Sequence, residues 1–365
     1  MWKRWQIMRR NKLGYMHNKI DISKLPVVLC CLSLFFFLDC TGRDVLTVSN
    51  VLFDDVRKVE YKEVECDFDF SYPVSLSLMD SFLIVQDEKG HDHFFHVLNS
   101  KNWNLHSEFA KKGNGPGELL YPTYSPQVVE GVFQIYDYNL NRIYFYVNDG
   151  DRIILEKSVN IHTDILESSF VRQCVCCMDF YVLTGEKGLF EEKQLAVFDD
   201  KLNYNGSFIE YLVLENSKEL DDLMQKELYN IHFIKITPNL KHLVFASYKS
   251  GVLQVFNMEN APHAVEKTTT LLLTPLVNGD KETIYGFEDL YVTDSYIYTL
   301  HNGSSPTENP LFTKEIKVFD MLGNPIVKYE VGIDMRCIAV NEEKKRAYTI
   351  AYTEEKGFFL IEIML

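Results

Sequence analysis

The stretch VFQIYDYNLNRIYFYVN at positions 132–148 contains the pattern on which the fold prediction rests. An apolar segment rich in aromatic and β-branched residues is followed by a short polar turn and then by a second apolar segment that ends in Asn. Aromatic and β-branched residues favour strands, and a polar turn between two such segments indicates an antiparallel hairpin. The stretch therefore predicts two paired strands.

The same paired pattern occurs six times, at intervals of about fifty residues with one longer interval before the fourth copy. The second segment of each pair usually ends in an aromatic or aliphatic residue followed by Asp or Asn. The pairs comprise residues 82–85 with 94–99, 132–136 with 142–148, 180–183 with 194–199, 242–246 with 252–257, 296–300 with 316–320 and 346–350 with 358–362. A repeat of this length made of short antiparallel strands is typical of a β-propeller blade.

Each pair is preceded by an inner strand, as at 74–78 or 337–340, and followed by an outer strand, as at 152–156 or 325–329. We therefore predict an all-β, six-bladed β-propeller over residues 56–365. The sixth copy ends at Leu365 without an outer strand, and an open ring would expose strand edges. We expect residues 56–65 to supply the missing strand and close the ring, with Val59, Tyr61 and Val64 as pairing candidates.

The prediction of six blades includes one insertion and has one alternative. The longer interval contains residues 214–229, whose apolar residues follow helical spacing and predict a short helix outside the blades. Two β-sandwich domains are the alternative architecture, but no segment in the middle of the chain has the composition of a linker.

Residues 1–40 resemble an export signal, because seven Lys and Arg residues flank or precede an apolar run at 25–38. That run is shorter than the roughly 20 residues of a membrane-spanning helix. It ends in Phe37-Leu38-Asp39-Cys40, which resembles a bacterial lipobox with Cys40 as the acylated residue, although Asp39 replaces the usual small residue. The alternatives are an uncleaved anchor and an ordinary signal peptide. Residues 41–55 are predicted to be a tether between the anchor and the propeller.

The net charge of −15 disfavours binding to nucleic acid, whose phosphates an acidic surface repels. Contact with the membrane would come from the lipid on Cys40. Five further cysteines, Cys66, Cys174, Cys176, Cys177 and Cys337, lack the spacing of a zinc or redox motif, so we predict free thiols. His91, His93 and His96 do not match known metal spacings either, and no metal ligands are assigned. We expect a monomer.

The stretch KKGNGPGEL at 111–119 is locally unusual, because Gly113, Gly115, Pro116 and Gly117 require a shaped loop. It is not a phosphate-binding loop, since Glu118 and the nearby Pro122 follow where Lys-Ser/Thr and a helix are needed. The loop, the six repeats and the signal together resemble the TolB-like six-bladed β-propeller lipoproteins that are abundant in Bacteroidetes, in which a GxGPGE segment follows the outer strand of an early blade. The resemblance covers nearly all of the exported chain. It implies an outer-membrane lipoprotein of the cell envelope, facing the periplasm or the medium, and it brings no catalytic residues.

In a propeller, the loops that enter the inner strands converge on the central channel, where ligands commonly bind. The candidate rim residues in these loops are Glu118, Tyr124, Arg172, His232, Glu288, Asp289 and Arg336, and the same loops hold Tyr72 and Tyr121. Tyrosines, arginines and carboxylates suit a peptide, a glycan or an envelope protein as partner. The leading hypothesis is therefore a binding module without a cofactor.

The alternative is a calcium-dependent, lactonase-like hydrolase with Glu118, Glu288 and Asp289 in the channel. Neither GxSxG nor HExxH occurs in the chain, so no catalytic residue is assigned.

Overall fold

The computed structural model describes residues 45–365 except 162–170, 186–192, 215–230, 278–281 and 308–311. The chain divides into a unit of Met1–Asp44 and a unit of Val45–Leu365, and only the second is described here. The described residues form strands, turns and loops, and they contain no helix that could cross a membrane. The predicted signal segment with Cys40, and the predicted helix after Leu214, lie outside these residues.

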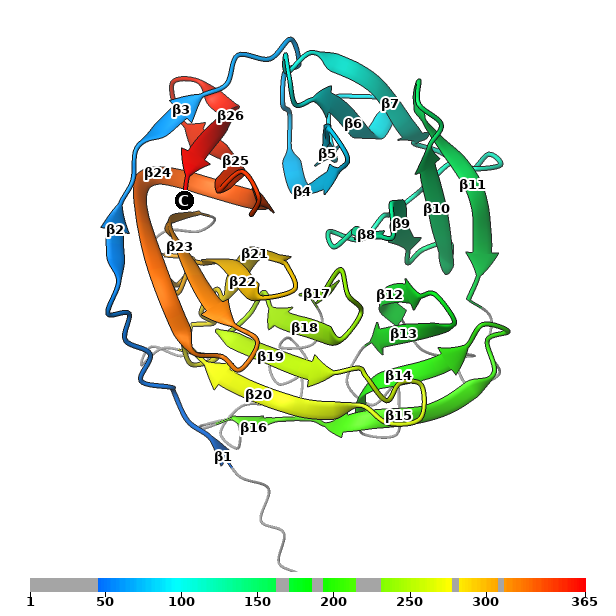
Figure 1. The fold of residues 1–365 in the computed structure, drawn as a ribbon, viewed down its shortest axis with the longest axis vertical. Coiled ribbons are helices and arrows are strands. Elements are labelled where there is room, and N and C mark those ends of the chain that lie inside the picture. The colour runs from blue at the N-terminus through cyan, green and yellow to red at the C-terminus, as the bar shows by residue number, and fades with distance from the viewer. Residues whose placement is uncertain (1–44, 162–170, 186–192, 215–230, 278–281, 308–311) are drawn as a thin grey trace, which may run out of the picture. The chain divides into compact units, whose positions relative to one another are not determined.

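The second unit is a ring of antiparallel sheets, each with its first strand nearest the ring centre (Figure 1). Four of these sheets have four strands each. Blade one contains β4 (Pro73–Met79), β5 (Phe82–Asp87), β6 (His93–Asn99) and β7 (Leu105–Lys111). Blade two contains β8 (Gln127–Val129), β9 (Val132–Asp137), β10 (Arg142–Asn148) and β11 (Ile153–Asn160). Blade three contains β12 (Val171–Cys177), β13 (Phe180–Gly185), β14 (Lys193–Asp199) and β15 (Tyr204–Glu210). Blade four contains β17 (His232–Ile236), β18 (His242–Ser247), β19 (Val252–Asn257) and β20 (Glu266–Leu272).

Blades five and six are joined in one eight-stranded sheet, because a single long strand belongs to both. Seven of its strands follow one another, namely β21 (Phe287–Val292), β22 (Tyr296–His301), β23 (Thr313–Asp320), β24 (Pro325–Asn341), β25 (Arg346–Thr353), β26 (Gly357–Met364) and β3 (Tyr61–Glu63), and the eighth, β2 (Val56–Lys58), pairs with β24. The first part of β24 pairs with β23 as the outer strand of blade five, and the second part pairs with β25 as the inner strand of blade six. The sequence predicted two separate strands here. The prediction of six blades is confirmed.

The N-terminal part of the second unit closes the ring. β3 pairs antiparallel with β26, where Tyr61 faces Ile363 and Glu63 faces Ile361. It thereby supplies the missing outer strand of blade six, as predicted. The preceding strand β2 (Val56–Lys58) pairs in parallel with β24 and adds a fifth strand to blade five.

Each blade buries both of its faces against its neighbours, as a propeller requires. The buried apolar residues form six clusters, and each cluster draws chiefly on two adjacent blades. Blades one and two, for example, share a cluster in which Phe95 stacks on Phe109 at 5.1 Å and meets Phe133 edge-on at 5.1 Å. Cys174, Cys176, Cys177 and Cys337 are buried free thiols, and Cys66 is a half-buried one, as predicted.

In blades one, three, four and five, the Asp or Asn at the end of the second apolar segment shapes the turn to the outer strand. In blade five, Asp320 Oδ1 accepts hydrogen bonds from the backbone amides of Leu322 (2.9 Å) and Asn324 (2.8 Å). Asp199 does the same in blade three, and Asn99 and Asn257 bond to the amide two residues later. This side-chain turn explains why the repeat has Asp or Asn at this position.

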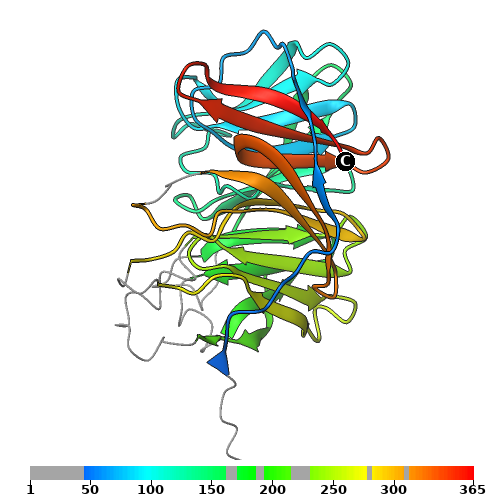
Figure 2. The same ribbon diagram turned by 90° about the vertical axis from the view of Figure 1, so that its left-hand side faces the viewer.

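Residues 45–55, within the predicted tether, lie against the ring in the structure. β1 (Val45–Leu46) pairs in parallel with β16 (Val213–Leu214), and the Ser49 amide donates to the Leu272 carbonyl at 2.7 Å. Val51 and Phe53 pack on the cluster between blades four and five. Figure 2 shows this N-terminal segment running along the outside of the ring toward β2 and β3. We call residues 49–56 the strap.

Candidate functional site

The six inner strands begin at the same end of the ring, because every blade repeats the same strand order. The residue after the second strand also lies at this end, beside the residue that precedes the inner strand. Backbone amides of Glu88, Tyr138 and Tyr248 donate to the carbonyls of Tyr72 (3.1 Å), Tyr121 (3.3 Å) and Ile231 (3.1 Å), respectively. Two chain positions in each of these blades therefore present side chains at the channel mouth.

Two buried aspartates hold the incoming loops in place. Asp87, at the end of β5, accepts hydrogen bonds from the amides of Ser71 (2.7 Å) and Tyr72 (2.8 Å). Asp137, at the end of β9, accepts from the amides of Leu120 (2.5 Å) and Tyr121 (2.8 Å). The oxygens of both carboxylates accept hydrogen bonds from backbone amides, so the two aspartates position Tyr72 and Tyr121 rather than face a ligand.

Arg336, on the inner strand of blade six, packs against Tyr72. Its guanidinium carbon lies 4.1 Å from the centre of the Tyr72 ring and 5.8 Å from that of Phe358. The Lys89 ammonium also lies 4.1 Å from the Tyr72 ring. These cation–π contacts combine charge and aromatic surface in one place.

Glu88 and Tyr124 form a second contact pair at the mouth. Burial raises the pKa of Glu88, while the hydrogen bond from Tyr124 and the charge of Arg336 oppose that shift. Burial and the neighbouring Glu88 carboxylate raise the pKa of Tyr124, so its hydroxyl stays a hydrogen-bond donor at neutral pH. Residues of blades one, two and six thus meet here.

Blades four and five contribute Tyr248, Lys249, Tyr285 and Glu288. The rings of Tyr248 and Tyr285 are 5.4 Å apart, and the Lys249 ammonium lies 4.6 Å from the Tyr285 ring. The Glu288 carboxylate accepts a hydrogen bond from the Asn302 amide at 3.3 Å. Burial raises the pKa of Glu288 to about 7, against the opposing charge of Arg336.

A pocket of about 170 Å³ lies between blades two, three and four at this mouth, lined in part by Tyr124, Tyr138, Arg172 and His232. The Arg172 guanidinium lies 5.9 Å from the Tyr138 ring. His232 stacks on Phe245 at 4.9 Å, and its Nε2 lies 2.5 Å from the Thr184 hydroxyl. The residues gathered at the mouth are called the mouth cluster: Tyr72, Glu88, Lys89, Tyr124, Tyr138, Arg172, His232, Tyr248, Lys249, Tyr285, Glu288 and Arg336.

Five of the seven candidate rim residues belong to this cluster, namely Tyr124, Arg172, His232, Glu288 and Arg336. Asp289 lies elsewhere, because its carboxylate accepts a hydrogen bond from the Ile338 amide at 2.9 Å inside the ring. Buried Lys235 is its charged neighbour: burial raises the pKa of Asp289 and lowers that of Lys235, and each charge opposes the shift of the other.

Glu118 is not brought to the mouth cluster either, since its carboxylate folds back onto its own loop. It accepts a hydrogen bond from the Gly115 amide at 2.7 Å, and the Lys111 ammonium lies 3.4 Å away. A Cβ atom on Gly113 or Gly115 would come within 2.1 or 2.8 Å of that carboxylate. The glycines therefore make room for Glu118, and the loop is a structural element.

The residues predicted from the sequence all precede the inner strands or lie near their start, and those that follow the second strands were missed. Glu88, Tyr138 and Tyr248 occupy the same position in three blades, directly after FLIVQD, VFQIYD and HLVFAS. Their shared position in the repeat was the sequence signal that could have identified these three residues. Among the described residues, no group of three or more His, Cys, Asp or Glu is arranged to hold a metal ion.

The fold and the mouth cluster define a six-bladed β-propeller that presents aromatic and charged side chains at one end of its channel. The chain belongs to the TolB-like 6-blade propeller-like family, whose model matches residues 54–343. No characterised protein matches it in sequence.

Solved structures with the same fold share little sequence with this chain. One is a protein of Bacteroides fragilis described as exported, with 10% identity, a TM-score of 0.54, and coverage of 87% of this chain and 98% of that chain. Another is a member of the DUF4221 family from Bacteroides vulgatus, with 13% identity, a TM-score of 0.52, and coverage of 84% and 97%. These likenesses concern the fold.

Proposed function

We propose that the protein is an exported binding module of the bacterial envelope that holds a peptide or a glycan at the mouth cluster. The observation that supports this function is the arrangement of Tyr72, Tyr248 and Tyr285 around the cations Arg336 and Lys249. Tyrosine rings stack on sugar faces and apolar side chains, while guanidinium and ammonium groups hold carboxylates. The mix of both suits an oligomeric ligand with polar and apolar faces.

Calorimetric titration with peptide and glycan panels tests this function. The wild-type protein should bind one class saturably, and Tyr72→Ala and Arg336→Ala should each weaken that binding at least tenfold. Tyr204→Ala is the matched control, because Tyr204 is an exposed tyrosine on the outer strand of blade three. Saturable binding that is unchanged in both Tyr72→Ala and Arg336→Ala would show that the site lies outside the mouth cluster. The absence of binding to every panel member would refute the function.

We further propose that a lipid on Cys40 anchors the protein in the outer membrane. The apolar run before Cys40 supports this proposal. Metabolic labelling with a fatty-acid analogue should mark the wild-type protein but not Cys40→Ala. Labelling of both would contradict the anchor.

A second candidate, a calcium-dependent hydrolase, is favoured by one observation, the buried Glu288 carboxyl with a pKa of about 7 beside the Asn302 amide. Carboxyls with such pKa values are common at catalytic sites. Calcium-dependent lactone turnover that is lost in Glu288→Gln would support this candidate, and identical turnover in EDTA would refute it.

A further inference from the structure

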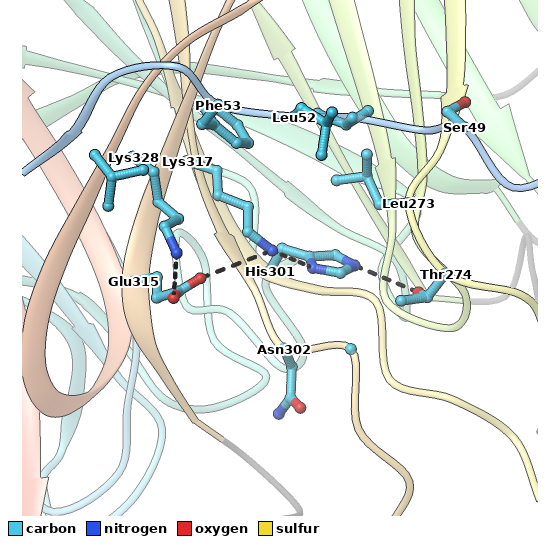
Figure 3. Close-up of a pocket in the computed structure, with 13 residues that line it drawn as sticks. Ser49, Leu52, Phe53, Leu273, Thr274, His301, Asn302, Glu315, Lys317 and Lys328 are labelled. Carbon is cyan, nitrogen blue, oxygen red and sulfur yellow. Dashed lines mark hydrogen bonds and ion pairs between the residues drawn. The ribbon is translucent and has the colours of Figure 1, made fainter.

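A second pocket, of about 510 Å³, lies under the strap beside blades four and five (Figure 3). Strap residues Leu52 and Phe53 form its cover, and Leu273 of the segment after β20 adds a further apolar wall. None of the mouth-cluster residues lines it. Its volume lies within the range of pockets that hold small molecules.

One side of the pocket is a row of connected polar side chains from β22, β23, β24 and the segment after β20 (Figure 3). Lys328 lies 2.9 Å from Glu315 Oε1, and Lys317 lies 4.0 Å from Glu315 Oε2. The Lys317 ammonium is 3.2 Å from His301 Nδ1, and His301 Nε2 is 3.3 Å from the Thr274 hydroxyl. The row therefore runs from Lys328 to Thr274 through Lys317.

His301 is neutral in this row. Its side chain is buried, and burial together with the Lys317 charge holds its pKa well below the usual range. A neutral imidazole has one acceptor and one donor nitrogen. Because Lys317 can only donate, Nδ1 is the acceptor and Nε2 carries the proton toward Thr274.

Lys317 has an incomplete set of partners in the described part of the chain. Its ammonium has three donors, of which His301 accepts one. Glu315 at 4.0 Å is beyond hydrogen-bond length, and that carboxylate is held by Lys328, which also contacts Glu330 at 3.1 Å. A largely buried cation is costly without a close counter-ion, so an anion in the pocket would stabilise Lys317.

The opposite wall is apolar and partly open. Leu52 has 70% of its surface exposed although it lies over the pocket, and Phe53 is fixed by an edge-on contact with Phe319 at 5.4 Å. A ligand with a hydrocarbon chain would cover Leu52 and Leu273. The pocket thus offers one underpaired cation on one side and an apolar surface on the other.

We propose that this pocket binds a small amphipathic carboxylic acid, whose carboxylate accepts hydrogen bonds from Lys317 while its hydrocarbon chain contacts Leu52 and Leu273. A single negative charge matches the single underpaired ammonium. A phosphate dianion fits less well, because its second charge would lie beside Glu315.

Calorimetric titration of the protein with octanoate tests this site. The wild-type protein should bind one octanoate, and octan-1-ol, which has the same chain length without the charge, should bind at least tenfold more weakly. Lys317→Met keeps most of the side-chain volume and should weaken octanoate binding at least tenfold. Lys314→Met is the matched control on the same strand, since Lys314 is exposed and does not line the pocket, and it should bind octanoate like the wild type.

Leu52→Asp is a second variant that does not disturb the core, because Leu52 is largely exposed. It should also weaken octanoate binding, through charge repulsion and loss of apolar contact. Octanoate affinity that is unchanged in both Lys317→Met and Leu52→Asp, an absence of saturable binding to the wild type, or inorganic phosphate binding tighter than octanoate would overturn the proposal. Because the pocket shares no residue with the mouth cluster, Tyr72→Ala should leave octanoate binding intact.

Discussion

At the scale of single residues, Glu288 links the charge of the mouth cluster to the stability of the fold. Its pKa is raised from 4.5 to about 7 by burial. Between these two values the unfolded chain releases the proton while the folded protein keeps it, so rising pH lowers the free energy of unfolding. Below pH 4.5 both states are protonated, and above pH 7 the loss is complete.

Glu288→Gln should remove this loss, because glutamine does not titrate. As the pH rises from 4.5 to 8, the variant should gain about 3 kcal/mol of stability relative to the wild type, since the pKa of Glu288 is raised from 4.5 to about 7 and one pKa unit corresponds to about 1.4 kcal/mol. Urea unfolding at a series of pH values measures the difference. Glu343→Gln, at an exposed position, is the matched control. If the free energy of unfolding of Glu288→Gln differs from that of the wild type by the same amount at every pH, Glu288 titrates normally.

The loop around Glu118 makes a separate prediction about the need for glycine. Gly115 has an ordinary backbone conformation, so alanine would be tolerated there except for the contact of its Cβ with the Glu118 carboxylate at 2.8 Å. Gly115→Ala should lower the melting temperature by displacing that carboxylate from its hydrogen bond with the loop. The same substitution in a Glu118→Ala background should cost less, and the double-mutant cycle measures the coupling. Equal costs in both backgrounds would show that Gly115 serves another purpose.

At the scale of elements, the turn after the third strand of blade five depends on one side-chain oxygen. Asp320 Oδ1 accepts two backbone amides, and Oδ2 accepts the Asn324 side-chain amide at 2.8 Å. Asp320→Ala should reduce the free energy of unfolding by about 1 kcal/mol, because two amides lose their partner. Asp320→Asn should cost less, since asparagine keeps Oδ1 and occurs at the equivalent positions 99 and 257. Thermal unfolding of both variants compares them, and an equal loss would rule out the turn as the cause.

The strands themselves could be predicted because their apolar segments and turn residues are local signals. The continuous strand β24 was not predicted, since polar residues such as Glu330 and Asp334 interrupt its apolar pattern. In the structure, Gly332 has φ of +82° between its two halves, and a register shift follows at Met335. Pairing with β23 and then with β25 keeps this segment extended, which is a tertiary effect that the local sequence does not contain.

At the scale of the whole molecule, the mouth cluster exists only because the ring closes. Tyr72, Tyr248 and Arg336 come from blades one, four and six, far apart in the chain. The sequence could propose Tyr72 and Arg336 only from their place before the predicted inner strands, and Tyr248 was missed. The pocket under the strap was beyond sequence reasoning, because it depends on residues 49–56 lying against blades four and five. The predicted tether gave no reason to expect that contact.

Ring closure by β3 can be tested with two shortened chains. A chain that begins at Asp54 keeps β2 and β3, whereas a chain that begins at Cys66 loses both and exposes the edge of β26. That edge carries the backbone groups of Ile361 and Ile363, whose side chains are buried, and an unpaired edge next to apolar residues promotes association. The shorter chain should therefore melt at a lower temperature and form oligomers in light scattering, while the longer chain should stay monomeric. A monomeric shorter chain with an unchanged melting temperature would show that the blades hold together without the closing strand.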